Sequence, residues 1–201
     1  MLSMLLCLFV LQALPAYSAT KTLLVLGDSI SAEYGLPRGS GWVRLLESRL
    51  QNEKTDAVVV NASISGETTA GGSARLPLLL KQHHPSIVLL ELGANDGLRG
   101  LSLAATQARL RDMIQLSVAA GAQVLIIPMQ IPPNYGPDYS KRFSALFQGL
   151  AKEKGVRLAP VLLRGLEDTD KFFQADRIHP NQAAQPLMLN NVWPVLKSLL
   201  H

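Results

Sequence analysis

The fold class of this chain can be predicted from the segment Thr22-Leu23-Leu24-Val25-Leu26-Gly27-Asp28-Ser29 and the pattern that follows it. Its apolar run has the length and the Leu- and Val-rich composition of a strand that is covered on both faces. The run ends at a glycine, a carboxylate and a hydroxyl. Four further apolar runs follow, and helical patterns separate them. Strands that alternate with helices are typical of a parallel sheet with helices on both sides.

We therefore predict one three-layer α/β domain, for which the length of 201 residues is sufficient. The predicted strands are Thr22–Gly27, Ala57–Asn61, Ile87–Leu92, Gln123–Pro128 and Val156–Ala159. The predicted helices are Gly41–Lys54, Ala74–His83, Leu103–Ala120, Tyr139–Lys154 and Ala183–Leu200.

Residues 1–19 have the composition of a secretory signal peptide. They contain no charged side chain, and Met4–Leu14 is almost wholly apolar and is followed by small residues. Cleavage after Ser18 and cleavage after Ala19 both fit the pattern. The apolar core is well short of the roughly 20 residues that a spanning helix needs. We expect one domain over residues 20–201 that is periplasmic or secreted, without stable membrane insertion after processing.

Composition excludes several classes of function. The only cysteine, Cys7, lies inside the signal segment, so the mature chain would have no disulfide, thiolate metal site or cysteine nucleophile. The net charge of +4 is modest and no basic run occurs, which argues against a nucleic-acid partner. We expect no metal, no cofactor and a monomeric chain.

Polar residues follow the predicted strands where each strand ends. Ser29 follows the first strand, Gly66 the second and Asn95 the third, while Asp176 and His179 lie in the loop before the last helix. Because ligands bind in the crevice at the carboxyl ends of parallel strands, we expect these residues to converge at one edge of the sheet.

These residue types fit a serine hydrolase. A serine hydroxyl needs an imidazole to take its proton and a carboxylate to orient that imidazole, which gives roles to Ser29, His179 and Asp176. We expect a helix to begin near Ser29, with its backbone N–H facing outward. The N–H of Gly66 and the side-chain amide of Asn95 would complete an oxyanion hole.

Other polar residues have structural interpretations. Asp28 and Asp96 are predicted to cap helices or hold loops, because short carboxylates favour such positions. His83-His84 is predicted to close a helix. Gly66–Gly72 lacks the ending of a phosphate-binding loop and is interpreted as a turn into a helix.

At this point the chain resembles the SGNH, or GDSL, hydrolases, whose four blocks centre on Ser29, Gly66, Asn95 and His179. The likeness extends over essentially the whole mature chain and to the exported bacterial thioesterases, lysophospholipases and arylesterases of that family. The matching stretches are Asn61–Gly66, Ala74–Pro77, Glu91–Gly93, Asn95–Gly100, Pro132–Gly136 and His179–Asn181. The resemblance implies a flavodoxin-like α/β/α fold with a central parallel five-stranded sheet. It also implies hydrolysis, without a metal, of acyl thioesters, aryl esters and lysophospholipids through an acyl-enzyme.

The resemblance also implies a substrate-gating loop after the Asn block, formed by Gly97, Leu98, Arg99, Gly100, Leu101 and Ser102. Apolar residues near the crevice, Ile131 and Pro132 among them, favour longer acyl chains. Two positions depart from the family pattern. Ala94 stands where a second glycine is common, and Arg177 stands where a glycine often precedes Ile-His. Neither change removes a reacting atom.

Three alternatives compete with this interpretation. An α/β-hydrolase would place its serine mid-chain in Gly-x-Ser-x-Gly, whereas Ser29 follows the first strand and Ser31 replaces the second glycine. A carbohydrate O-deacetylase would prefer two-carbon acyl groups. A non-catalytic exported protein could use the same crevice to bind a lipid or a sugar.

Overall fold

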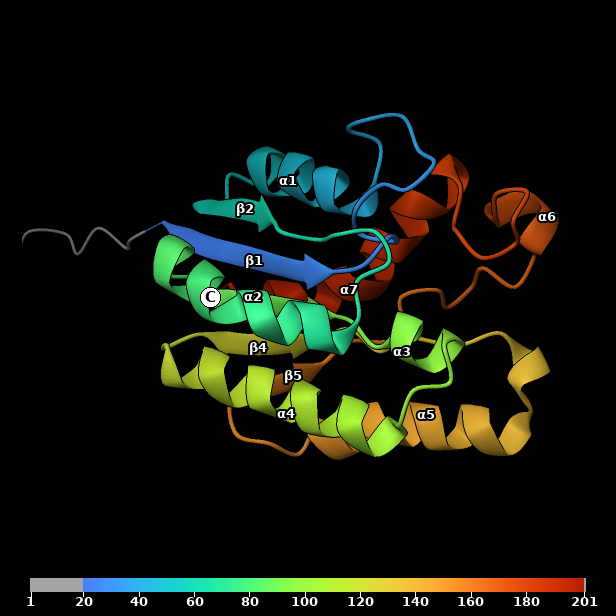
Figure 1. Cartoon of the computed structure of the whole chain (residues 1–201). Coiled ribbons are helices and arrows are strands. Elements are labelled where there is room, and N and C mark those ends of the chain that lie inside the picture. The colour runs from blue at the N-terminus through green and yellow to red at the C-terminus, as the bar shows by residue number, and fades with distance from the viewer. Residues whose placement is uncertain (1–19, 201) are drawn as a thin grey trace, which may run out of the picture.

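The computed structural model describes residues 20–200, so the predicted signal peptide lies outside the described residues. Its centre is a sheet of five strands in the order β2-β1-β3-β4-β5, in which every neighbouring pair is parallel (Figure 1). This confirms the predicted fold class. The strands are β1 (Lys21–Gly27), β2 (Ala57–Asn61), β3 (Ile87–Glu91), β4 (Gln123–Ile126) and β5 (Val156–Leu158).

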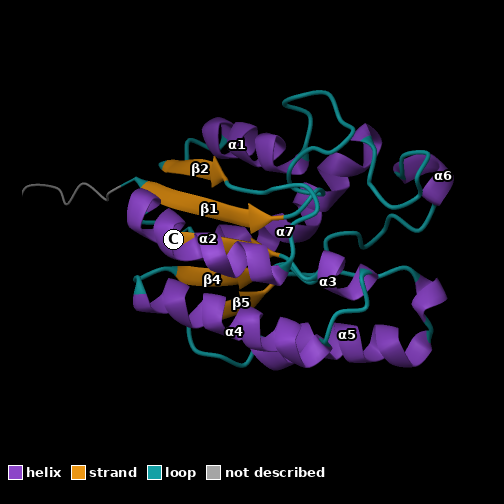
Figure 2. Ribbon diagram, in the orientation of Figure 1, coloured by secondary structure: helices purple, strands orange, loops and turns teal. Residues whose placement is uncertain are grey.

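Helices cover both faces of this sheet and make the outer two layers (Figure 2). They are α1 (Trp42–Asn52), α2 (Thr69–His83), α3 (Ala94–Leu98), α4 (Leu103–Ala119), α5 (Pro137–Leu150), α6 (Thr169–Phe172) and α7 (Gln185–Leu199). Two 3₁₀ turns, η1 (Pro133–Tyr135) and η2 (Gln182–Ala184), complete the set. Between residues 20 and 200, no helix has the length and apolar character to cross a bilayer.

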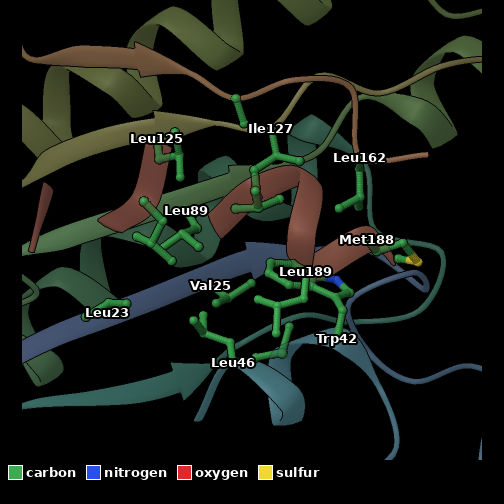
Figure 3. Close-up of a cluster of buried hydrophobic side chains, with 14 of the residues drawn as sticks. Leu23, Val25, Trp42, Leu46, Leu89, Leu125, Ile127, Leu162, Met188 and Leu189 are labelled. Atoms are coloured by element: carbon green, nitrogen blue, oxygen red, sulfur yellow. The ribbon is translucent and has the colours of Figure 1, made fainter. Parts of the chain in front are cut away.

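The core consists of two apolar clusters, one on each face of the sheet. Successive strand residues point to opposite faces. In β1, Leu23 and Val25 pack with α1 and α7 (Figure 3). Leu24 and Leu26 pack with α2, α4 and α5 on the other face. This double burial explains why the strands are almost continuously apolar.

Helix α2 begins at Thr69, five residues before the predicted start at Ala74, so that prediction was wrong. Gly66–Gly72 is interpreted from the sequence as a turn into a helix, whereas Gly71 and Gly72 already lie inside α2 although glycine lowers helix propensity. Tertiary contacts override that cost here, because a Cβ on Gly72 would lie 2.4 Å from Leu92 Cδ1. The buried Asp96 accepts hydrogen bonds from Thr69 N (2.8 Å) and Thr69 Oγ1 (2.5 Å), which satisfies the first turn.

Other helices also differ from the predictions. The short helices α3 and α6 were not predicted, since five and four residues carry little periodic signal. The predicted helix over Tyr139–Lys154 is displaced to Pro137–Leu150, and the predicted last helix is divided into η2 and α7. No regular helix begins at Ser29; a series of turns follows it instead.

Candidate active site

Ser29 lies just after β1, in a turn at the carboxyl edge of the sheet. The N–H of Ala32 bonds to Asp28 O (3.0 Å) and the N–H of Tyr34 bonds to Ser29 O (3.1 Å). Gly27 is required by a close approach, since a Cβ there would lie 2.4 Å from Glu91 Oε2. Because no helix follows, a helix dipole behind Ser29 is not part of this site. The turn itself presents the serine.

The loop between α6 and η2 carries Asp176 and His179. Asp176 Oδ1 accepts hydrogen bonds from the backbone N–H groups of Ile178 (2.9 Å) and His179 (3.0 Å), and Oδ2 contacts His179 Nδ1 at 2.7 Å. The loop is tied back by the N–H of Gln174, which donates to His179 O (2.8 Å). Arg177 takes a left-handed conformation (φ +57°), which glycine would adopt with less strain.

The predicted catalytic side chains meet in one chain of hydrogen bonds. His179 Nε2 lies 2.9 Å from Ser29 Oγ, and its Nδ1 faces the Asp176 carboxylate. Burial opposes ionisation of Asp176, but the two backbone N–H groups and the imidazole outweigh it and lower the pKa of Asp176 to about 2. An ionised Asp176 accepts only, so Nδ1 carries the hydrogen and Nε2 is free to accept the serine proton.

Gly66 and Asn95 face the same edge from β2 and β3. Gly66 has a φ of +76°, and Arg99 Nη2 donates to its carbonyl at 3.0 Å. Asn95 Nδ2 donates one hydrogen to Asp28 Oδ2 at 3.2 Å, which leaves its second hydrogen for a ligand. Within residues 20–200, the backbone N–H groups of Ser29 and Gly66 make no hydrogen bond.

Two acids lie buried beneath Ser29. Asp28 is 1% exposed and Glu91 is fully buried. Burial raises the pKa of Asp28 to about 6. The hydrogen bonds from Ile30 N and Asn95 favour its charged form and lower the pKa, but they do not outweigh burial. Burial, together with the nearby Asp28, raises the pKa of Glu91 well above its ordinary value. Asp28 holds the turn and Asp96 caps α2, so the structural roles predicted for both are confirmed.

Tyr34 is a neighbour of the imidazole that sequence analysis missed. Its ring centroid lies 4.4 Å from that of His179, and its carbonyl accepts a hydrogen bond from Gln174 Nε2 (2.8 Å). No motif marked this residue, because the contact joins the turn after β1 to a loop near the end of the chain. His84, by contrast, ends α2 in a left-handed conformation, as predicted for the His83-His84 pair.

A cleft of about 410 Å³ opens over Ser29 and His179. Three of the predicted substrate-binding residues, Leu98, Ile131 and Pro132, line it. The opposite wall was not predicted from the sequence and comes from the segment that contains α6. Its lining residues are Leu163, Leu166, Glu167, Thr169, Phe173, Arg177 and Ile178.

The other residues of the predicted gating loop do not line the cleft over Ser29. Leu101 and Ser102 line a second cavity, of about 600 Å³, between α4 and α5, and Ser102 also caps α4. Gly97 lies under Ile131 and Phe143, and Gly100 is a turn glycine with φ +63°. Two tyrosines tie the loop down, because Tyr135 Oη donates to Leu98 O (2.8 Å) and Tyr139 Oη to Gly97 O (3.3 Å).

In the part of the chain that the structure describes, no group of three or more His, Cys, Asp or Glu side chains is placed to hold a metal ion. The side chains that line the cleft offer a hydroxyl, an imidazole, carboxyls and amides. On a parallel α/β sheet, with the serine after the first strand, this set defines an ester hydrolase of the SGNH type.

Comparison with known proteins identifies the family. Residues 25–186 match the GDSL-like Lipase/Acylhydrolase family, and the chain belongs to it. It is 51% identical to Esterase TesA of Pseudomonas aeruginosa, over 94% of both chains. It is 44% identical to Thioesterase 1/protease 1/lysophospholipase L1 of Escherichia coli strain K12, over 92% of this chain and 87% of that one. The expectation of a hydrolase that acts on ester bonds is thereby confirmed at the level of the family.

A solved structure supports the same assignment. The psychrotrophic esterase EstA from Pseudoalteromonas sp., in a form inhibited by monoethylphosphonate, is 42% identical and has a TM-score of 0.85. The match covers 90% of this chain and 98% of that one.

Proposed function

We propose that this protein is a serine esterase and thioesterase that hydrolyses acyl esters and thioesters through a Ser29–His179–Asp176 triad and an acyl-enzyme intermediate. The observation that carries the proposal is the continuous contact from Ser29 Oγ to His179 Nε2 (2.9 Å) and from His179 Nδ1 to Asp176 Oδ2 (2.7 Å). A nucleophile, a base and an orienting group within hydrogen-bond reach are the minimum for this chemistry.

The steps follow from the positions of the atoms. His179 Nε2 takes the proton of Ser29 as Oγ bonds to the substrate carbonyl carbon. The carbonyl oxygen becomes negative and is met by the N–H groups of Ser29 and Gly66 and by the amide of Asn95. His179 then gives its proton to the leaving alcohol or thiol. A water molecule, deprotonated by the same nitrogen, attacks the acyl-enzyme; the acid leaves and Ser29 regains its hydrogen.

The substrates we propose are acyl-CoA-type thioesters, aryl esters and lysophospholipids. The mostly apolar lining of the cleft, with Leu98, Ile131 and Pro132 on one wall, supports an acyl chain longer than acetate. The printed names of the two relatives include esterase, thioesterase and lysophospholipase. We further propose that Gly97–Ser102 gates this wall, with Arg99 coupling the loop to Gly66 through its bond to Gly66 O.

The remaining elements of the proposal come from the sequence. Residues 1–19 would direct export and be removed, and residues 20–201 would act in the periplasm or outside the cell. We propose a monomer without a nucleic-acid partner, a cofactor or stable insertion into a membrane.

The test is hydrolysis of p-nitrophenyl esters of increasing acyl length by the purified mature protein, beside Ser29→Ala and with excess EDTA. We expect activity that survives EDTA, prefers medium or long chains and falls at least about 10⁴-fold in Ser29→Ala, with the fold intact by circular dichroism. Activity on acetate alone would instead support the O-deacetylase. A protein that is inactive on every ester would be the binding protein, and the proposal would be wrong.

A further inference from the structure

Glu91 is a buried carboxyl group to which the proposed mechanism gives no task. It is the last residue of β3 and is fully buried. Its position in the strand alternation, after Ile87 and Leu89, places it on the face covered by α1 and α7. There its Oε2 atom lies under the turn that carries Ser29, within 3.1 Å of the backbone nitrogen of Asp28.

The donors around Glu91 Oε2 all point toward it. The indole of Trp42 can only donate, and its Nε1–H bonds to Ser31 Oγ at 3.1 Å. Ser31 Oγ accepts that hydrogen and donates its own to Glu91 Oε2, at 2.6 Å. The backbone N–H of Asp28 donates to the same oxygen. Oε2 accepts two hydrogen bonds and carries no proton of its own.

The other oxygen of this carboxyl group, Oε1, is buried and has no hydrogen-bond partner among residues 20–200. A negative charge shared with such an atom is strongly disfavoured. The groups that face Glu91 provide no cation. The turn contributes the acidic Asp28, α1 contributes Trp42, and Gln185 at the start of α7 bonds to Trp42 N. Burial and Asp28 together raise the pKa of Glu91, which favours its neutral form. Because Oε2 accepts from Asp28 N and Ser31 Oγ, Oε1 is the oxygen left to hold the proton.

We propose that Glu91 is a positioning residue that works as a neutral acid, holding the Ser29 turn by accepting hydrogen bonds from Asp28 N and Ser31 Oγ. Asp28, held in this way, accepts from Asn95 Nδ2 on its other side. A single uncharged acceptor, Glu91, thus positions both the nucleophile Ser29 and the oxyanion donor Asn95. The inference rests on the proposed function of Ser29 and Asn95, and it adds a role that needs the carbonyl-type oxygen of Glu91 without its charge.

A pair of substitutions separates the acceptor from the charge. Glu91→Gln keeps an oxygen at the Oε2 position and replaces the protonated Oε1 with an amide. Glu91→Leu has a similar volume and removes the acceptor. We expect kcat of Glu91→Gln to stay within about threefold of the wild type, because both hydrogen bonds are kept. We expect kcat of Glu91→Leu to fall about 10–10²-fold with little change in KM, because a displaced nucleophile lowers only the chemical step.

The charge state is read directly from the infrared spectrum. At pH 8 the wild type should show the C=O stretch of a protonated carboxyl group that is missing from Glu91→Gln. Glu47→Gln, on the outer part of α1, is the matched control and should keep this band. This readout also works if Glu91→Leu fails to fold, since it uses the conservative variant only.

The outcomes are distinct from those of the proposed function. An inactive wild type, or an active Ser29→Ala, would overturn the proposed function itself. With that function intact, wild-type kcat in Glu91→Leu would remove the positioning role. A Glu91→Gln protein as slow as Glu91→Leu would show that Glu91 acts as a charged group. A wild type that at pH 8 lacks the protonated-carboxyl band, and loses carboxylate bands on Glu91→Gln instead, would show the same. Either result would overturn the inference.

Discussion

Asp176 and Asp28 both lie near Ser29, but their surroundings favour different protonation states. Asp176 lies in a loop with its side chain 38% exposed, whereas Asp28 is buried in the turn after β1. At Asp176 burial is outweighed by two backbone N–H groups and the imidazole, and the pKa falls to about 2. At Asp28 burial outweighs its hydrogen bonds from Ile30 N and Asn95, and the pKa rises to about 6.

The comparison shows that hydrogen bonds alone do not decide the charge of a carboxyl group. Both aspartates accept backbone and side-chain hydrogen bonds, but Asp28 has lost its solvent and lies beside a second acid, Glu91. Ionisation of Asp176 therefore stabilises the folded protein, whereas ionisation of Asp28 destabilises it. Four substitutions or conditions test this contrast.

The largest effect is expected for Asp176→Asn. An amide at this position can donate to His179 Nδ1, which would favour the tautomer with the hydrogen on Nε2 and leave no base for Ser29. We expect kcat to fall about 10³–10⁴-fold with KM nearly unchanged. Steady-state kinetics on an aryl ester measures this, with the exposed Asp170→Asn as the matched control. A fall of less than tenfold would mean that the exposed aspartate does not orient the histidine.

Asn95→Ala tests the oxyanion side of the site. Removal of one side-chain donor from an oxyanion hole costs about 10²–10³-fold in kcat. The same ester assay measures it, and Asn134→Ala, on the exposed η1 turn, serves as the control. An unchanged kcat in Asn95→Ala would exclude this amide from transition-state binding.

A smaller loss of activity, with a gain in stability, is expected for Asp28→Asn. A pKa raised from 3.8 to about 6 corresponds to about 3 kcal/mol of instability at pH 7 for the ionised form. Loss of the hydrogen bond from Asn95 offsets about 1 kcal/mol of that gain. We expect the Tm at pH 7 to rise by roughly 4–8 °C while kcat falls about 10–10²-fold, because Asn95 loses its acceptor.

Thermal unfolding and kinetics on the same preparation check this pair of effects. The stability gain should shrink as the pH falls through 6 and vanish well below pH 3.8, where Asp28 is protonated in both the folded and the unfolded wild type. A variant that is less stable than the wild type at pH 7 would show that burial does not penalise the Asp28 charge.

The smallest expected effect is the loss, at acid pH, of the stability that Asp176 contributes. Its folded pKa lies below its unfolded value, so its stabilisation is fully present above about pH 4 and is lost as the pH falls through 2. Because the group is partly exposed, we expect less than about 1 kcal/mol. Urea unfolding of wild type and Asp176→Asn between pH 5 and pH 2.5 measures the difference. Parallel curves for the two proteins would contradict the lowered pKa.

Sequence reasoning found the strands more accurately than the helices. Ala57–Asn61 has the predicted bounds, and the other four strands differ by one or two residues at an end. Burial on both faces gives such strands a continuous apolar signal. The start of α2 was missed because the contact of Gly72 with Leu92 and the bond from Thr69 to Asp96 join residues distant in the sequence.

The site, like the fold, could be predicted only in part. Motifs marked five of its residues: Ser29, Gly66, Asn95, Asp176 and His179. The structure brings the triad residues Ser29, His179 and Asp176 into direct contact. Tyr34 and the cleft wall near Phe173 were not marked, because a lone tyrosine and an apolar loop residue carry no signal of their own. Glu91 was named only within a stretch that matches the family, and its bond to Ser31 was not predicted.

The layer order of the fold and the chemical groups of the site could be predicted from the sequence, because both depend on patterns that are local or tied to strand ends. The pKa shifts of the carboxyl groups and the walls of the cleft follow only from the three-dimensional arrangement. Burial and hydrogen bonding depend on segments that are far apart along the chain. Asp28 and Asp176 are the same residue type, and their surroundings move their pKa values in opposite directions.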